Sequence, residues 1–338
     1  MKKRYFFNRR IFLKIFLFFL FIKKNYSQNN RKNKIIFGSC SNQKFIMKHW
    51  KKILSKNPEY LILLGDNVYG DFNNKNANEL KEAYSMLDKN LDFRLIKKKI
   101  PIIPIWDDHD YGKNDGGKKW KYKNISKNIF LKFFQTPVND IRYKREGIYR
   151  SYKITINKKI IKVIGLDTRY FKDDFKKNNN DKINAKYIPD LDSKRTILGE
   201  EQWNWLVNET KDIYDVVIIL SSFQLLSKSH GWEKWYNFPL EREKILNLLN
   251  KINKTKIILS GDRHLGGFYK LNDLYELTSS SLNQRVFNTN EYDEFRLGDT
   301  VNENNFGILE FTENNILASL VSSNLEINKV YKFLSIKI

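Results

Sequence analysis

The sequence predicts an α/β protein built as a four-layer αββα sandwich, in which helices cover the outer faces of two packed sheets. From residue 34 onward, short apolar runs alternate with longer amphipathic stretches. Gly, Asp or Ser follows most of the apolar runs, as expected where a strand ends. Further strand-like runs near the C-terminus have no helical stretch between them, and these predict the second sheet.

In the first half of the chain, three apolar runs each precede an amphipathic stretch with helical spacing. We expect each run to form a buried strand, because it is short and rich in Ile and Leu, and each stretch to form a helix packed on the sheet. The pairs are 34–40 with 44–56, 59–66 with 78–99, and 100–110 with 124–135.

The second half repeats this alternation and then ends in strands. The strand and helix pairs are 158–167 with 198–211 and 215–222 with 239–252, followed by strand-like runs at 255–264, 268–271, 274–280, 306–312 and 316–323. An Asn- and Lys-rich stretch at 173–194 predicts a surface insertion. Because no linker or repeat divides the chain, we expect residues 30–338 to form one domain.

The composition is that of a globular protein, because 41% of the 338 residues are hydrophobic and 14% are aromatic. The formal net charge is +23, to which residues 1–27 contribute eight positive charges and no negative one. The remaining lysines are scattered without a compact basic block, so we expect attraction of anionic esters but no nucleic-acid binding. Cys40 is the only cysteine, so no intramolecular disulfide can form. No segment indicates a protein partner.

Residues 1–27 resemble a secretory signal. A basic stretch precedes an apolar run from Ile15 to Ile22, and a polar segment ending at Ser27 follows. The run is too short to span a bilayer comfortably, so a signal peptide fits better than a membrane helix. We expect a secreted or periplasmic protein, with an uncleaved membrane anchor as the alternative. This segment is the only expected contact with a membrane.

Polar side chains with ligand chemistry follow the predicted strands at the points where they end. In open α/β sheets, loops at the carboxyl ends of strands converge on one crevice and bind ligands there. We therefore expect these side chains to share a site. They are Cys40, Asp66, Asp108, His109, Asp167, Asp262 and His264.

The stretch WDDHDYG, residues 106–112, concentrates three carboxylates around one imidazole. Adjacent carboxylates resist ionising together unless a positive charge lies between them, which indicates a metal ion. Asp108 can then bind the metal and His109 can meet the substrate, while Asp107 or Asp110 orients the imidazole. The alternative for this stretch is a solvated acidic turn.

Other strand ends carry matching donors. Asp66 and Tyr69 supply hard oxygens, and an Asp can bridge two ions. Asp262 and His264 flank one residue, so both can face the same concavity. The thiolate of Cys40 suits iron better than magnesium or calcium. Taken alone, each has a structural alternative: a helix cap, a core tyrosine or a buried inert cysteine.

Two arginines and one loop complete the candidate site. Arg169 and Arg263 could hold phosphate oxygens with their forked donors, although each could instead form a surface ion pair. The stretch 229–239 contains His230 and two tryptophans. It either forms a wall of the pocket or packs in the core.

Six motifs occur in the order FGSCSNQ, LGDNVYGD, WDDHDYGKNDGG, LDTR, LGEEQWNWL and SGDRHLGG. In this order they resemble the PhoD-like alkaline phosphatases, within the calcineurin-like and purple-acid-phosphatase-like metallophosphoesterases. The resemblance runs from about Lys34 to Leu282. It implies a four-layer αββα fold and a centre that holds Fe³⁺ and Ca²⁺, with another divalent metal as the alternative at the second site.

The resemblance also implies roles for single residues. His109 would contact the phosphoryl group or the leaving oxygen. The residues matched to metal ligands are Cys40, Tyr69 and His264 for the iron, Asp66 for the bridge, and Asp108 and Asp262 for the second ion.

Together these features predict an exported phosphoric ester hydrolase, an alkaline phosphatase or phosphodiesterase acting on phosphate mono- or diesters. Two cations would offset the phosphate charge and lower the pKa of a bridging water, so that hydroxide attacks phosphorus, and His109 would protonate the leaving oxygen. The alternative is a non-catalytic surface protein that keeps the fold and binds anionic polymers through its lysines. Such a protein is expected to lose motif residues, which this chain retains.

Overall fold

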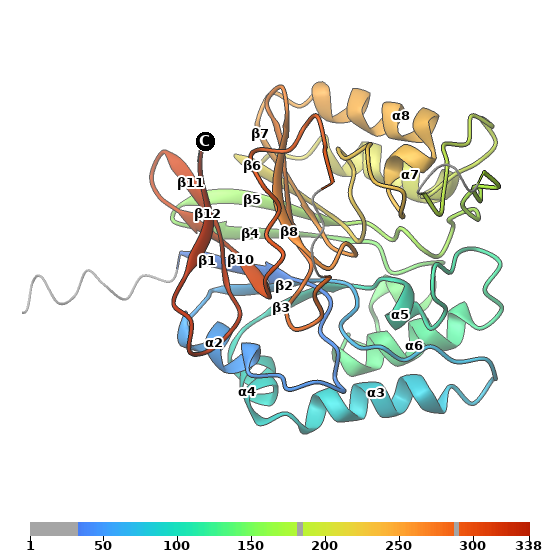
Figure 1. Cartoon of the computed structure of the whole chain (residues 1–338), viewed down its shortest axis with the longest axis horizontal. Coiled ribbons are helices and arrows are strands. Elements are labelled where there is room, and N and C mark those ends of the chain that lie inside the picture. The colour runs from blue at the N-terminus through green and yellow to red at the C-terminus, as the bar shows by residue number, and fades with distance from the viewer. Residues whose placement is uncertain (1–32, 181–184, 287–290) are drawn as a thin grey trace, which may run out of the picture.

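The structure is a computed structural model that describes residues 33–180, 185–286 and 291–338. Two six-stranded sheets pack face to face, and helices cover both outer faces (Figure 1). The predicted four-layer αββα fold is therefore confirmed. The predicted signal segment, residues 1–27, lies outside the described residues. Within the described part of the chain, no helix is long and apolar enough to span a bilayer.

The first sheet has the strand order β12-β11-β10-β1-β2-β3. β1, β2 and β3 are parallel, so their carboxyl ends meet at one edge, whereas β10, β11 and β12 pair antiparallel. The strands are β1 (Lys34–Gly38), β2 (Tyr60–Leu64), β3 (Ile102–Ile105), β10 (Asn305–Phe311), β11 (Asn315–Ser322) and β12 (Val330–Lys337).

The second sheet has the order β4-β5-β6-β7-β9-β8. Its four central strands are parallel, and the two edge strands pair antiparallel with their neighbours. The strands are β4 (Arg150–Ile156), β5 (Lys159–Gly165), β6 (Val216–Ser221), β7 (Thr255–Ser260), β8 (Gly266–Leu271) and β9 (Leu274–Ser279).

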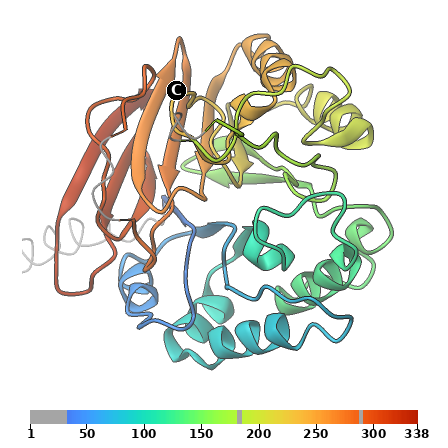
Figure 2. The same ribbon diagram turned by 45° about the vertical axis from the view of Figure 1, so that its right-hand side comes forward.

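The helices of the first half of the chain cover the first sheet, and those of the second half cover the second sheet. In Figure 2 the former are blue to green and lie in the lower half of the picture, and the latter are yellow to orange and lie at the upper right. They are α2 (His49–Ser55), α3 (Asn78–Lys89), α4 (Leu91–Lys99), α5 (Asp108–Tyr111), α6 (Lys123–Phe133), α7 (Gly199–Glu209) and α8 (Pro239–Asn250), with short 3₁₀ turns η1 (Ile141–Tyr143) and η2 (Trp235–Asn237).

Three buried apolar clusters hold the layers together. One lies between the sheets and contains alternate strand residues such as Phe37 and Val163. The second joins the outer face of the first sheet to its helices through residues such as Trp50, and the third joins the second sheet to α7 and α8 through residues such as Leu206. Burial of both faces explains why the central strands are uninterrupted apolar runs rather than alternating ones.

Some elements differ from the prediction. The amphipathic stretch 78–99 forms two helices, because the Asn90 side chain accepts a hydrogen bond from the Phe93 amide at 3.0 Å and begins α4. The stretch 44–56 becomes helical only at His49. β4 and β12 were not predicted. Both are edge strands with many half-buried or exposed positions, so neither forms an apolar run.

The insertion at 173–194 is only partly a surface segment. It begins at Asp173, whose buried carboxylate lies 2.6 Å from Lys118 Nζ. Near its end, Lys186 and Tyr187 contact the carboxylate of Asp115. The described part of this segment therefore packs onto the loop that follows α5.

Candidate metal centre and active site

The predicted site lies where the carboxyl ends of parallel strands from both sheets face one another. Cys40 follows β1, Asp66 follows β2, Asp108 begins α5 after β3, and Asp262 and His264 follow β7. All of these except Asp108 have positive φ, between 47° and 67°. Backbone of this kind costs about 1–3 kcal/mol per residue and is concentrated at functional sites.

Gly65 permits two of these loops to touch. Its φ is +98°, and a Cβ at this position would collide with the Cβ and backbone nitrogen of Asp107. Only glycine therefore lets the loop after β2 pack directly against the loop after β3. This contact brings Asp66 close to Asp108.

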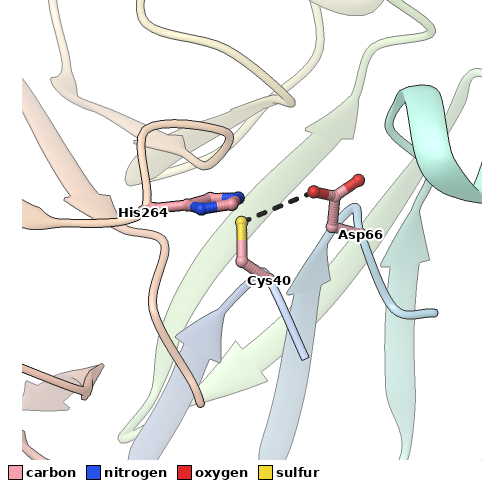
Figure 3. A group of neighbouring side chains, drawn as sticks. All are labelled: Cys40, Asp66 and His264. Carbon is pink, nitrogen blue, oxygen red and sulfur yellow. Dashed lines mark hydrogen bonds between the residues drawn. The ribbon is translucent and has the colours of Figure 1, made fainter. Parts of the chain in front are cut away.

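The first group of candidate ligands contains Cys40, Asp66 and His264. Their donor atoms all lie within 4.8 Å of one another. Figure 3 shows the three side chains, from three different loops, pointing toward one another, with the Cys40 thiol 3.7 Å from Asp66 Oδ2. The Tyr69 hydroxyl lies 3.1 Å from His264 Nε2, so it stands beside the same group.

Two further groups continue from the first. Asp66, Asp108 and His109 form the second, and Asp108, Asp115 and Glu233 form the third. Asp66 is common to the first two groups and Asp108 to the last two. The three groups are therefore connected through shared carboxylates.

The chemistry of the first two groups fits a pair of cations. In the described part of the chain, Asp66 Oδ1 is buried without a hydrogen-bond partner, which is costly unless a positive group meets it. Burial, together with neighbouring carboxylates, raises the pKa values of Asp66 and Asp262 well above the usual range. A cation beside either carboxylate would remove that penalty. The mixture of thiol, phenol, imidazole and carboxylate is a transition-metal donor set.

His109 is held by a carboxylate that was not predicted. Its Nδ1 donates to Asp71 Oδ2 at 2.5 Å, which leaves Nε2 as the nitrogen available to a substrate. Although burial opposes the charged form, Asp108, Asp66 and Asp71 raise the pKa of His109 to about 11. The prediction that Asp107 or Asp110 orients this imidazole is therefore wrong, because Asp71 makes this contact.

Asp110 instead holds the two loops that carry the candidate ligands Asp66 and Asp108. Its carboxylate is fully buried and accepts hydrogen bonds from the amides of Asn67 and Val68, from the amide of Asp107, and from the Tyr84 hydroxyl. Asp110 lies only one residue after His109, but its side chain turns into the protein. It is therefore a positioning residue for the loops after β2 and β3.

Arg169 is also placed differently from the prediction. Its guanidinium is 0% exposed. Nε donates to Asp107 Oδ1 at 2.6 Å, and the two terminal nitrogens donate to the carboxylate of Glu233 at 2.8 and 2.7 Å. Because these bonds occupy the fork inside the protein, Arg169 does not present donors to a phosphate. It holds the Glu233 loop against the loop after β3.

Asp167, expected to join the site, is a structural residue as well. Its carboxylate accepts from the indole nitrogen of Trp106 at 2.9 Å and from the amides of Ile148, Arg169 and Tyr170.

The ligand groups open into a cavity of about 570 Å³. Arg263 lies on its wall, with one guanidinium nitrogen 2.5 Å from Glu291. The cavity gathers the predicted Asp66, Asp108, His109, Asp262, Arg263 and His264. Gly231, Trp232 and Glu233 also line it, so this part of the stretch 229–239 forms a wall of the pocket, which was one of its two expected roles. The unpredicted lining residues are Asn114, Asp115, Lys186, Val286 and Glu291.

Some of the residues that were not predicted lie within the sequence motifs, and others do not. Asp71 and Asp115 stand inside motifs that were already singled out, two residues after Tyr69 and five after Asp110. Lys186 stands in the long insertion at 173–194 with no ligand pattern, so only the three-dimensional contacts reveal it. Glu233 lies in the stretch 229–239, which was singled out as a possible wall, but only the structure pairs it with Arg169.

An αββα sandwich with thiol, carboxylate and imidazole donors at the shared carboxyl edge of its sheets defines a metallophosphoesterase-like protein. A family model described as PhoD-like phosphatase matches residues 35–316. The chain therefore belongs to the PhoD-like phosphatase family.

Individual relatives agree with this assignment. Alkaline phosphatase D of Bacillus subtilis (strain 168) is 21% identical over 253 residues, which cover 66% of this chain and 43% of that protein. The chain thus matches less than half the length of that relative. The solved structure of PhoD has a TM-score of 0.68 at 16% identity, covering 88% of this chain and 68% of that one. GAP50, the anchor in the inner membrane complex of Plasmodium, has a TM-score of 0.60 at 14% identity, covering 90% and 88%. Both structures share the fold.

Proposed function

We propose that this protein is a metal-dependent phosphoric ester hydrolase that acts on phosphate mono- or diesters. The observation that carries the proposal is that two candidate ligand groups share Asp66. Four members of these groups, Asp66, Asp108, His109 and His264, line one cavity. Family membership supports phosphate esters as the substrate class.

The donor chemistry supports one ion of ferric character and a second, harder ion. Cys40, Tyr69, Asp66 and His264 would hold Fe³⁺, and Asp66, Asp108 and Asp262 would hold Ca²⁺ or another divalent metal. Such a pair supplies a nucleophile from water at neutral pH and offsets the charge of the phosphate.

The side chains of the protein would then orient the substrate and move the proton. His109, fixed through Nδ1 by Asp71, offers Nε2 to the leaving oxygen. Proton donation of this kind typically contributes 10²–10⁴-fold to the rate. Arg263 lies on the cavity wall beside His264 and offers a positive charge to the phosphate oxygens. Asp110 holds the loops after β2 and β3 in place through buried hydrogen bonds. Arg169 holds the Glu233 loop against the loop after β3.

Replacement of Asp66 tests the proposal. Asp66→Asn removes the carboxylate shared by both ligand groups, so we expect it to abolish hydrolysis of an aryl phosphate monoester and a bis-aryl diester, and to lower the metal content found by elemental analysis. Asp192→Asn, an isosteric change at an exposed turn, is the matched control and should leave both unchanged. Full activity in Asp66→Asn would refute the ligand assignment. A metal-loaded wild-type protein that binds anionic polymers without hydrolysing either ester would favour the non-catalytic alternative.

We also propose that the protein is exported. Support comes from residues 1–27, in which a basic stretch precedes a short apolar run. Expression of the full chain in a bacterial host, followed by fractionation and mass spectrometry of the N-terminus, tests this. We expect periplasmic or secreted protein that begins near residue 28. An intact N-terminus in the membrane fraction would favour the anchor, and an intact N-terminus in the cytoplasm would contradict export.

A further inference from the structure

The loop at 230–235 exposes one large aromatic side chain while burying all the other residues around it except Gly231. Trp232 is 50% exposed, whereas His230, Glu233, Lys234 and Trp235 are each 6% exposed or less. The two tryptophans of this loop therefore have different roles. Trp235 packs in the core and donates to Ser221 Oγ at 2.9 Å, and Trp232 faces the cavity.

A network of buried polar groups fixes the backbone that carries Trp232. His230 Nε2 lies 3.1 Å from Gln224 Oε1, and its Nδ1 accepts a hydrogen bond from the Trp232 amide at 3.2 Å. The Lys234 ammonium donates to the carbonyls of His230 and Trp232.

The two chain neighbours of Trp232, Glu233 and Gly231, are also held in place. Glu233 is bound through both carboxylate oxygens to the buried Arg169. The amides of Lys186 and Tyr187 also donate to the carbonyl of Gly231, at 2.9 and 3.0 Å. Trp232 is thus an exposed indole on an anchored backbone, so little backbone entropy would be lost if a ligand packed on it.

Trp232 shares a cavity with several of the candidate metal ligands. It lines the same cavity as Asp66, His109 and His264. Val286 belongs to the same lining and is also partly exposed. An ester whose phosphate reaches the ligand groups in this cavity could therefore place an organic substituent against the exposed indole.

We propose that Trp232 is a specificity-determining residue that stacks on a flat ring in the organic part of the phosphate ester. This rests on the proposed function and adds the class of substrate: esters of aryl groups or nucleosides rather than of small alkyl groups. An aromatic face on indole is favoured by stacking in addition to area burial. Base stacking on an aromatic side chain changes affinity by about 5–150-fold.

Inhibitor pairs test this without depending on which ester bond is cleaved. The probes are phenylphosphonate against methylphosphonate, and adenosine 5′-monophosphate against ribose 5-phosphate. Each is measured as a competitive Ki for the metal-loaded full chain, with 4-nitrophenyl phosphate or bis(4-nitrophenyl) phosphate as substrate, whichever wild type hydrolyses faster. We expect wild type to prefer the ring-bearing member of at least one pair by about tenfold. The phenyl pair reports an aryl group and the nucleotide pair a nucleobase.

Three variants complete the experiment. Trp232→Ala should reduce the preference about tenfold, and Trp232→Phe should retain most of it. Phe333→Ala removes another exposed aromatic side chain, from the edge strand β12, which does not line the cavity, and it should change nothing. Metal content and thermal unfolding show that each variant is folded.

The outcomes are distinguishable. An active wild type whose preference survives in Trp232→Ala, or a wild type that prefers neither ring, overturns the role of Trp232 and leaves the hydrolase proposal standing. A metal-loaded wild type that hydrolyses no ester and binds no phosphonate overturns both.

Discussion

The clearest prediction concerns Arg169, because the structure assigns it a role that differs from the one suggested by its place in the LDTR motif. Its guanidinium is fully buried between Asp107 and Glu233. We consider Arg169→Met, which keeps a similar length and removes the charge, and Arg169→Lys, which keeps the charge and loses the fork.

The expected cost follows from this geometry. Arg169→Met leaves two buried carboxylates without their cation, and breaking a buried ion pair in this way costs about 3–5 kcal/mol. We therefore expect the free energy of unfolding to fall by about that amount. Arg169→Lys should fall between Arg169→Met and wild type, because an ammonium cannot reproduce the bidentate contact with Glu233.

Urea unfolding at fixed excess metal measures this, and hydrolysis of an aryl phosphate measures KM alongside it. Arg94→Met, at an exposed position of α4, is the control and should change the unfolding free energy by less than about 0.5 kcal/mol. A substrate-binding arginine would show the opposite behaviour. The structural role would be refuted if Arg169→Met unfolded like wild type but had a raised KM.

Two further predictions concern histidines. Asp71→Asn weakens the contact that orients His109, so we expect kcat to fall about 10–100-fold while elemental analysis finds the metal content unchanged; an unchanged kcat would show that Asp71 is dispensable. Burial lowers the pKa of His49 to about 3, below its ordinary value near 6.5, so its contribution to stability is present above pH 6.5 and is lost as the pH falls. Wild type should lose about 2 kcal/mol more than His49→Gln between pH 7 and pH 5. Equal losses in urea titrations at the two pH values would argue against a buried neutral His49.

The sequence alone was sufficient to predict the layers and most of the side chains that the fold gathers at the candidate site. Cys40, Asp66 and His264 follow strands that are buried on both faces, and such strands are continuous apolar runs that can be recognised locally. Their carboxyl ends converge because the strands are parallel. β4 and β12 were not predicted because edge strands are half solvated, so their residues do not form a continuous apolar run.

The tertiary structure decided which side chain meets which. Asp71 rather than Asp110 contacts His109, although Asp110 is its neighbour in the chain. Arg169 bonds to Glu233, 64 residues away, and so lies in the interior rather than on the cavity wall. Only the fold could also separate the exposed Trp232 from the buried Trp235. Hydrophobic periodicity is a local property of the chain, whereas hydrogen-bond partners and burial depend on contacts between distant loops.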